Sequence, residues 1–143
     1  MEDEKKIKPA AKRAGLIVKS KKKTAVARAV IKKGSGVIKV NNVNLNAYFR
    51  GYMKELVMEP IRLAGEAAKE FDIDINVQGS GFMSQASAIR SCIAKAIVKA
   101  KGKKFKELFT AYDRMLLVDD VRRVESKKPL GRKARKKKQH SKR

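Results

Sequence analysis

Cysteine and histidine are scarce in this sequence, and each scarcity excludes a class of protein. The single cysteine, Cys92, has no second thiol to pair with, which excludes a small secreted fold held by internal disulfides. The single histidine, His140, lies among basic residues with no acid beside it, so it cannot anchor a Ser-His-Asp or Cys-His catalytic set. Metal-ligand spacing is absent as well. We therefore expect a protein that is not an enzyme and that needs no metal or cofactor.

Long apolar runs are also missing. No stretch approaches the roughly 18 residues that a membrane span needs, and the acidic start of the chain lacks the apolar segment of a signal peptide. The basic C-terminal stretch has no apolar face, which argues against a role at a membrane surface. Cys92 lies in an apolar helical run and is interpreted as a buried, inert thiol. These features predict a protein of the reducing cytoplasm with no membrane partner.

Basic residues are abundant and unevenly placed. The 143 residues include 37 Lys and Arg against 14 Asp and Glu, a formal charge of +23. Residues 1–33 hold 12 basic and 3 acidic residues, residues 121–143 hold 12 and 1, and the stretch between them is nearly balanced with 13 and 10. Such a charge repels itself, so the expected partner is a polyanion: nucleic acid, an anionic membrane surface or an acidic protein. We predict a flexible basic arm (1–13), a globular body (14–120) and an extended basic tail (121–143).

The first half of the body and one later segment have strand patterns. Residues 16–18 and 23–31 predict strands, 34–36 predict a turn, and 37–40 predict the partner strand of a β-hairpin. The clearest strand is 71–77, where apolar and polar residues alternate strictly.

Helical spacing fills the remaining body. Residues 48–71 are mostly helical in pattern, and Pro60 marks either a helix start or a break there. A second helix has a core stripe from Ala86 to Ala100 and ends at Gly102, followed by a shorter helix over 104–111 and an apolar anchor over 115–118. The order of elements predicts an α+β fold: a small mixed sheet with helices packed on one face.

The turn 79–81 leads from the clearest strand into the second helix. This order is typical of a dinucleotide-binding loop, but Ser84 replaces the third glycine and no acidic residue stands about 20 residues further on. A tight turn and a phosphate contact at the helix N-terminus both remain open interpretations. The helix side that follows either packs on the sheet or meets RNA; it carries Ser84, Ala88, Ser91, Lys95 and Lys99.

Acid pairs and the basic tail complete the candidate features. Asp72 with Asp74, and Asp119 with Asp120, are interpreted as solvated surface rather than as catalytic pairs. Residues 126–143 mix Arg with Lys, and Arg forms bidentate bonds to phosphate. If extended, about 20 residues reach roughly 65 Å, so the tail can act far from where the body docks.

Several motifs resemble those of the family of the ninth protein of the small ribosomal subunit, and their order follows that family along most of the chain. Residues 22–28 match its opening basic strand, 40–42 with 48–49 match the exit of the next strand, and 79–81 with 85–90 match the glycine turn and helix start. The remaining matches are Asp113-Arg114, Glu125-Ser126-Lys127-Lys128, Gly131, Ala134-Arg135, Gln139 and Ser141-Lys142-Arg143.

The departures from this family are small. Ser80 stands at the middle position of the turn and Ser84 before the glutamine, where the family often has glycine. Residues 53–71 and 116–118 resemble the archaeal type more than the bacterial one. The departures affect the details of the turn and leave the resemblance as a whole unchanged.

The resemblance implies a fold and a function. The fold would be that of the second domain of the fifth small-subunit protein, with a left-handed β-α-β crossover where the general rule favours a right-handed one. The protein would be a structural constituent of the small-subunit head in the cytoplasm, binding 16S ribosomal RNA beside neighbouring head proteins and taking no small-molecule substrate. Its tail would reach the transfer RNA in the peptidyl site.

The same resemblance, together with the charge pattern, selects the expected binding residues. Those expected to bind ribosomal RNA are Lys21, Lys22, Lys23, Arg28, Gly79, Ser80, Gly81, Gln85, Arg90, Arg114, Arg122, Arg123, Lys127, Lys128, Arg132, Lys133, Arg135, Lys136, Lys137, Lys138 and Gln139. Those expected to reach transfer RNA are Ser141, Lys142 and Arg143.

Two rival functions remain open at this point. A basic architectural DNA-binding protein would carry a similar charge, although neither a dimer interface nor a minor-groove wedge is evident. A nucleotide enzyme would use the turn 79–81 and would bind free nucleotide tightly, which we do not expect. Tyr48, Phe49 and Tyr52 either stack on bases or pack in the core.

Overall fold

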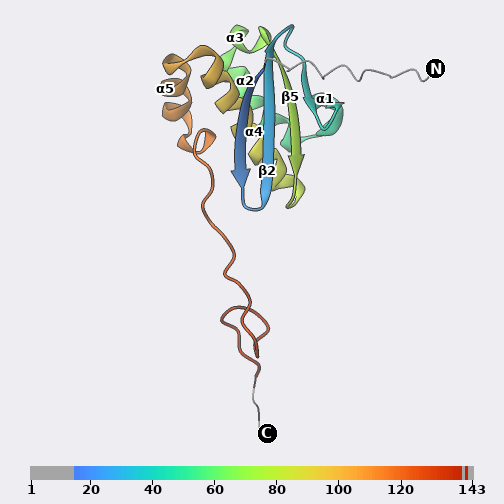
Figure 1. The fold of residues 1–143 in the computed structure, drawn as a ribbon, viewed down its shortest axis with the longest axis vertical. Coiled ribbons are helices and arrows are strands. Elements are labelled where there is room, and N and C mark those ends of the chain that lie inside the picture. Colours follow the sequence, from blue (N-terminus) through green and yellow to red (C-terminus); the bar gives the residue numbers. More distant parts are fainter. Residues whose placement is uncertain (1–14, 140, 142–143) are drawn as a thin grey trace, which may run out of the picture.

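Five strands form one mixed sheet in the computed structural model, which describes residues 15–139 and 141. The strands are β1 (Leu16–Lys22), β2 (Ala25–Lys33), β3 (Ile38–Val40), β4 (Val43–Asn44) and β5 (Phe71–Gln78). Their order across the sheet is β1-β2-β5-β3-β4, with β3 parallel to β5 and every other neighbouring pair antiparallel. Helix α4 lies behind the sheet in Figure 1 and packs against β1, β2 and β5, which confirms the predicted α+β fold class.

Within residues 15–139, six helical segments of different lengths accompany the sheet. They are α1 (Leu45–Tyr48), α2 (Tyr52–Ala64), α3 (Glu66–Lys69), α4 (Phe82–Lys101), α5 (Lys103–Tyr112) and the 3₁₀ turn η1 (Arg114–Leu116). Gly102 ends α4 with φ +92, as predicted, and its N–H donates to the carbonyl of Val98.

Strand alternation decides which sheet face is covered. The apolar residues of β5 (Ile73, Ile75 and Val77) are buried beneath the helices, and the intervening polar residues face the other way. The same phase holds in β2, where Ala27 and Ala29 are fully buried. Small residues on β2 let α4 approach the sheet closely, and the predicted stripe of α4 becomes the centre of the core.

Cys92 lies in the middle of this packing. Its side chain is fully buried, and its Sγ lies 3.7 Å from the carbonyl oxygen of Ala27. Burial raises the pKa of the Cys92 thiol to about 12, so the group stays protonated and unreactive. The prediction that Cys92 is buried is confirmed, and the raised pKa agrees with an inert thiol.

The predicted hairpin between residues 23–31 and 37–40 is wrong, because β5 lies between β2 and β3. β2 pairs with β5 from Val26↔Gln78 to Lys33↔Phe71, and β3 pairs with the other edge of β5. The carboxylate of Asp72 accepts hydrogen bonds from the backbone N–H groups of Val37 and Ser35, each at 2.9 Å, and they hold the pKa of Asp72 below its usual range. These bonds hold the turn 34–36 against the start of β5.

The predicted helix start or break at Pro60 is also wrong. α2 continues through Pro60, which is buried in the helix interior together with Val57 and Ala64. Packing of this apolar side compensates for the one helical N–H that proline lacks. The breaks fall instead at Gly51 and Gly65, both with positive φ, and they divide the helical stretch into α1, α2 and α3.

Candidate nucleic-acid interface

One face of the sheet carries no helix, and its exposed side chains are mostly basic or amide. Cross-strand register places Lys19 opposite Arg28 and Arg28 opposite Asn76, in one row across β1, β2 and β5. We call this surface the open face; its polar members are Lys19, Lys21, Arg28, Lys32, Lys39, Asp72, Asp74, Asn76 and Gln78.

Both acids of the open face already have partners. Asp72 holds the turn 34–36, and Asp74 lies 3.4 Å from the ammonium of Lys32. Within residues 15–139, the side chains of Lys19, Arg28 and Lys39 form no hydrogen bond or ion pair. Asp72 attracts Lys39 electrostatically, but no hydrogen bond or ion pair within the described residues engages the three cations, which remain available to an external anion.

The chemistry of the open face favours the backbone of a nucleic acid over its bases. Arg28, Lys39 and Asn76 help to line a hollow of about 290 Å³ beside the 41–42 turn. No aromatic ring lies on this face within the described strands, so it offers no platform for base stacking. Its cations and amides suit phosphate and sugar oxygens. Strand alternation could have identified Lys19 and Lys39, which the sequence predictions of binding residues omitted.

Lys22 is placed differently from its neighbours Lys21 and Lys23. It is 8% exposed, and its ammonium donates to the carbonyl oxygens of Met115 at 3.1 Å and Val118 at 3.2 Å. Desolvation lowers the pKa of Lys22, although nearby acids act against the shift. The structure thus places this ammonium inside the body, whereas Lys23 is exposed, and RNA binding by either lysine stays a prediction.

Arg90 and Gln85 are likewise engaged within the body. Arg90 donates to Glu59 at 2.7 Å and to Asp113 at 2.9 Å, which joins α4 to α2 and to the residue before η1. Burial raises the pKa of Asp113, but the Met115 N–H and the Arg90 guanidinium outweigh it and the pKa falls. Gln85 donates to the carbonyl of Gly79 at 3.1 Å. Their internal bonds give both side chains structural roles.

The turn 79–81 has the geometry of a tight connection. Gly79 has φ +85, and a Cβ there would lie 2.7 Å from the carbonyl oxygen of Thr24. Ser80 follows with φ +57, and α4 begins at Phe82. Glycine is therefore required at position 79 for close approach to the β1–β2 turn, which supports the structural interpretation of this motif.

The chain leaves the body through a hydrogen-bonded segment, residues 119–122, which we call the tail root. Asp119 accepts from the hydroxyl of Ser20 at 3.0 Å, the N–H of Lys21 at 3.1 Å and the ammonium of Lys95 at 2.6 Å. Asp120 is 8% exposed, and the side chain and N–H of Arg122 hold its pKa well below the usual range. The interpretation as solvated surface is wrong for Asp120, which is buried, whereas the Asp119 side chain stays 43% exposed. Both residues attach the tail to β1.

The outer edge of β1 is covered by side chains and by the tail root. Lys99 donates to the carbonyl of Ile17 at 2.9 Å, Lys95 to that of Lys19 at 3.4 Å, and the N–H of Asp120 to that of Lys21 at 3.3 Å. The sequence left undecided whether this side of α4 packs on the sheet or contacts RNA. Its residues Ala88 and Ser91 are buried, which supports packing. These contacts also obstruct pairing with a further strand.

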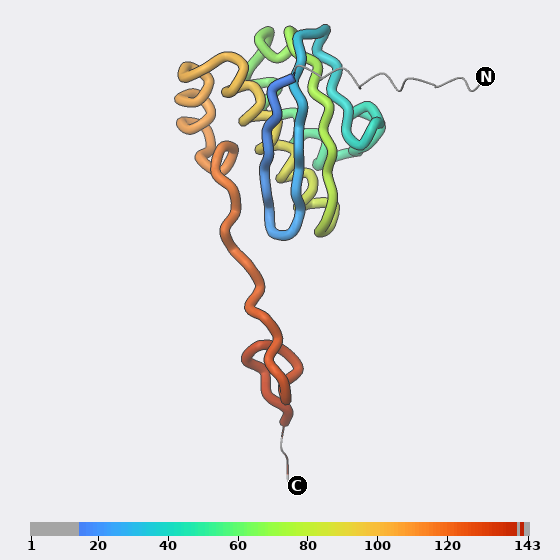
Figure 2. The backbone as a smooth tube through the Cα atoms, viewed as in Figure 1, coloured from blue at the N-terminus to red at the C-terminus, as the bar shows by residue number. Residues whose placement is uncertain are grey.

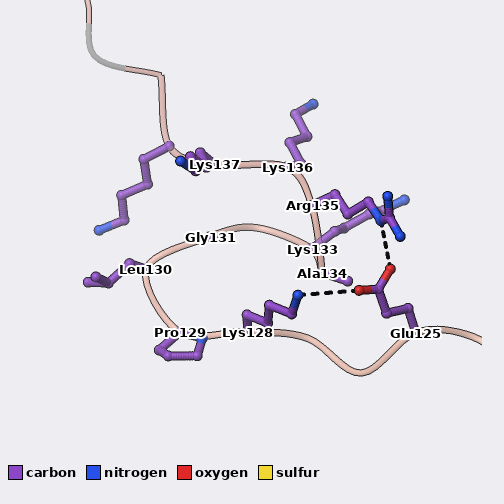
Figure 3. A pocket seen from close by; sticks show the side chains of 11 residues that line it. Glu125, Lys128, Pro129, Leu130, Gly131, Lys133, Ala134, Arg135, Lys136 and Lys137 are labelled. Atoms are coloured by element: carbon purple, nitrogen blue, oxygen red, sulfur yellow. Dashed lines mark hydrogen bonds and ion pairs between the residues drawn. The ribbon is translucent and has the colours of Figure 1, made fainter.

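Beyond the tail root, residues 125–138 fold back on themselves in what we call the tail loop (Figures 2 and 3). Gly131 and Lys137 form an antiparallel bridge, and the N–H of Arg132 donates to the carbonyl of Lys136 at 2.9 Å. The loop exposes many predicted RNA-binding cations: Lys127, Lys128, Arg132, Lys133, Arg135, Lys136, Lys137 and Lys138.

The remaining predicted residues lie on the surface or outside the described part. Arg114, Arg123, Gln139 and Ser141 are exposed. Arg122 is exposed and pairs with Asp120. Lys142 and Arg143, predicted to reach transfer RNA, lie outside the described residues, as do His140 and the predicted arm over 1–13. The division into arm, body and tail stays a prediction.

Tyr48, Phe49 and Tyr52 lie at the start of the helical region and differ in exposure. Phe49 is buried and packs edge-on against the half-buried Tyr48, with ring centroids 4.8 Å apart. Tyr52 is 70% exposed. Core packing therefore accounts for Phe49, while Tyr52 is accessible to a partner.

The described residues offer neither a metal site nor a membrane-spanning helix. Residues 15–139 contain no group of three or more His, Cys, Asp or Glu side chains placed to hold a metal ion. The helices in this same part of the chain are too short or too polar to cross a membrane. What the described part presents is a basic sheet face and a basic loop.

The protein has an α+β body, a basic sheet face that no helix covers, and a basic loop in its tail. These features define a class of basic binding proteins. The family description "Ribosomal protein S9/S16" matches residues 20–143, and the chain belongs to this family. Membership of a ribosomal protein family confirms both the resemblance and the prediction that the chain is not an enzyme.

Curated archaeal relatives are similar over most of their length, and each is named "Small ribosomal subunit protein uS9". That of Picrophilus torridus is 46% identical over 127 residues, covering 88% of this chain and 96% of the relative. That of Methanococcus maripaludis strain C5 is 49% identical over 110 residues, covering 76% and 82%. That of Pyrobaculum aerophilum is 45% identical over 120 residues, covering 83% and 84%.

Proposed function

We propose that this chain is a structural constituent of the small ribosomal subunit, where it binds 16S ribosomal RNA in the head beside neighbouring proteins. The observation that carries the proposal is its similarity to archaeal proteins named for that subunit, over 88% of this chain in one case. Its net charge of +23 fits a particle built largely of polyanion. The cytoplasm, as the site of ribosomes, is its proposed location.

Binding would be electrostatic and positional. Lys19, Arg28 and Lys39 on the open face would neutralise phosphates of one RNA segment, and the tail loop would neutralise those of another. The tail root fixes the direction in which the chain leaves the body, because Asp119 and Asp120 both bond to β1. The open face and the tail loop would therefore contact separate segments of the RNA.

The proposed contact with transfer RNA rests on the end of the chain. Ser141, Lys142 and Arg143 would touch the backbone of the transfer RNA in the peptidyl site. Removal of the last two residues should weaken the binding of peptidyl-site transfer RNA to reconstituted subunits without impairing assembly. Unchanged transfer RNA affinity in those subunits would exclude this role.

Equilibrium binding to folded ribosomal RNA and to duplex DNA, across a range of salt concentrations, tests the proposed RNA binding. We expect preference for folded ribosomal RNA and a steep loss of affinity with salt. The matched variants are Lys39→Ala on the open face and Lys104→Ala on α5, each removing one exposed lysine. Lys39→Ala should weaken RNA binding more than Lys104→Ala. Preference for duplex DNA would instead favour the architectural DNA-binding alternative.

A further inference from the structure

The tail loop contains one acidic residue among eight cations, and that acid lies where the loop closes. Between residues 121 and 143 the sequence has a single Asp or Glu, which is Glu125. One of its carboxylate oxygens accepts from Nε of Arg135 at 2.8 Å, and the other lies 3.4 Å from Nζ of Lys128 (Figure 3). Glu125 thus joins two cations that are seven residues apart in the sequence.

The backbone of the loop is closed by contacts that do not involve Glu125. Gly131 bridges Lys137, and the N–H of Arg132 donates to the carbonyl of Lys136 at 2.9 Å. A Cβ at position 131 would lie 2.8 Å from that same Lys136 carbonyl oxygen and 3.1 Å from the carbonyl oxygen of Lys133. The crossing of the chain therefore needs glycine at 131, and Ala134, another small residue, is half-buried beside it.

The closed loop surrounds a hollow with a basic lining. The hollow has a volume of about 740 Å³, and its rim includes Pro129 and the exposed side chain of Leu130. Leu130 has φ +62, a backbone region that leucine rarely adopts. The loop thus has a defined surface, with a strained, exposed leucine at its tip and cations around the hollow. An unstructured basic tail would have no such surface.

We propose that Glu125 is a positioning residue that holds the tail loop closed in the free protein, so that its cations bind an RNA backbone as a preformed unit. This inference rests on the proposed function, because RNA is the partner. Without Glu125, Arg135 and Lys128 would lose the group that joins them, and eight like charges would repel each other. RNA would then have to order the loop during binding, which weakens affinity.

If Glu125 has this role, its removal should weaken RNA binding, whereas the accompanying rise in net charge alone would strengthen it. Glu125→Gln and Ser126→Lys each raise the charge of the tail by one, at adjacent positions. If charge alone governed binding, both variants would bind RNA more tightly. If Glu125 closes the loop, Glu125→Gln should bind more weakly, by about fivefold, whereas Ser126→Lys should bind as well as the unsubstituted chain or better.

The experiment measures the affinity of the full chain for transcribed 16S ribosomal RNA, together with amide hydrogen exchange at Arg132 without RNA. We expect Glu125→Gln and Gly131→Ala both to speed exchange at Arg132 and to weaken RNA binding, with the melting temperature of the body unchanged. Slow exchange at Arg132 in Glu125→Gln, or tighter RNA binding by that variant, would overturn the role of Glu125. If the unsubstituted chain bound no RNA, the proposed function would fail and this inference with it.

Discussion

Lys22 and Lys23 are adjacent in the sequence, but their ammonium groups have different surroundings. The ammonium of Lys22 donates to two backbone carbonyls near the tail root, and that of Lys23 is exposed at the β1–β2 turn. Composition alone gives both lysines the same weight as RNA contacts. Burial separates a lysine that stabilises the fold from one that can bind a partner.

The pair Lys22→Met and Lys23→Met tests this separation. Lys22→Met leaves the carbonyls of Met115 and Val118 without their donor, so we expect a loss of about 1–3 kcal/mol in the free energy of unfolding. Lys23→Met should leave stability unchanged and reduce RNA affinity. Urea unfolding and RNA titration of both variants provide the measurement. Equal stability of the two variants would contradict the assigned role of Lys22.

Asp119 predicts how stability depends on pH. Burial raises the pKa of Asp119, but the Lys95 ammonium, the Lys21 N–H and the Ser20 hydroxyl outweigh it, so its pKa lies below the usual 3.8. A carboxylate with a lowered pKa contributes stability that is fully present above its unfolded-state value and is lost as pH falls through the folded-state value. Its contribution should therefore be complete above about pH 4 and decline below it.

The midpoint of urea unfolding, followed from pH 6 downward, measures this contribution. Asp119→Asn should be less stable than the unsubstituted chain near pH 6, and the difference should shrink as pH falls below about 4. The shrinkage is expected because protonated Asp119 and asparagine are both uncharged. A difference that stayed constant with pH would contradict the ionised role of Asp119.

At the scale of elements, the glycine turn before α4 has one position that requires glycine and one that does not. Gly79 has positive φ and no space for a Cβ, whereas Gly81 has φ −94, and a Cβ added to it would have no atom within 4 Å. Gly79→Ser should therefore cost more than about 1 kcal/mol of unfolding free energy. Gly81→Ser should be neutral or slightly stabilising, since serine is a good N-cap.

Thermal unfolding of the two serine variants checks this expectation. Because both carry the same new side chain, the comparison isolates backbone conformation and space. If Gly81→Ser destabilised the body as much as Gly79→Ser, the turn would not have the geometry described here.

Elements with strong periodicity could be predicted from the sequence, and elements fixed by distant contacts could not. The strict alternation of β5 and the apolar stripe of α4 gave both elements correctly, because each pattern follows from one buried face. The hairpin failed because Asp72, more than 30 residues away, holds the 34–36 turn over β5. Sequence proximity favoured pairing of β2 with β3, but nothing local revealed the intervening strand.

The candidate site shows the same division. The abundance of basic residues in the tail was evident from composition. Composition did not reveal which cations remain unpaired, because the partners of Lys22, Arg90 and Lys95 come from distant elements. Nor could the sequence alone reveal that Asp119 and Asp120 attach the tail to β1.

At the scale of the whole molecule, the body and the tail loop make separate contributions. Within residues 15–139, no hydrogen bond or ion pair joins residues 124–139 to the body. A chain ending at Arg123 should therefore keep the melting temperature of the body, while its salt dependence of RNA binding becomes shallower by roughly 0.7–0.9 in log-log slope per lost phosphate contact. Calorimetry and salt titration check the two parts. A lowered melting temperature would indicate that the tail supports the body.

Sedimentation of a cell lysate through sucrose gradients at low and high salt tests the central claim most directly. A structural constituent lodged in ribosomal RNA should migrate with the small subunit at both salt concentrations. Absence of the protein from ribosomal fractions at both would contradict its proposed place in the small subunit.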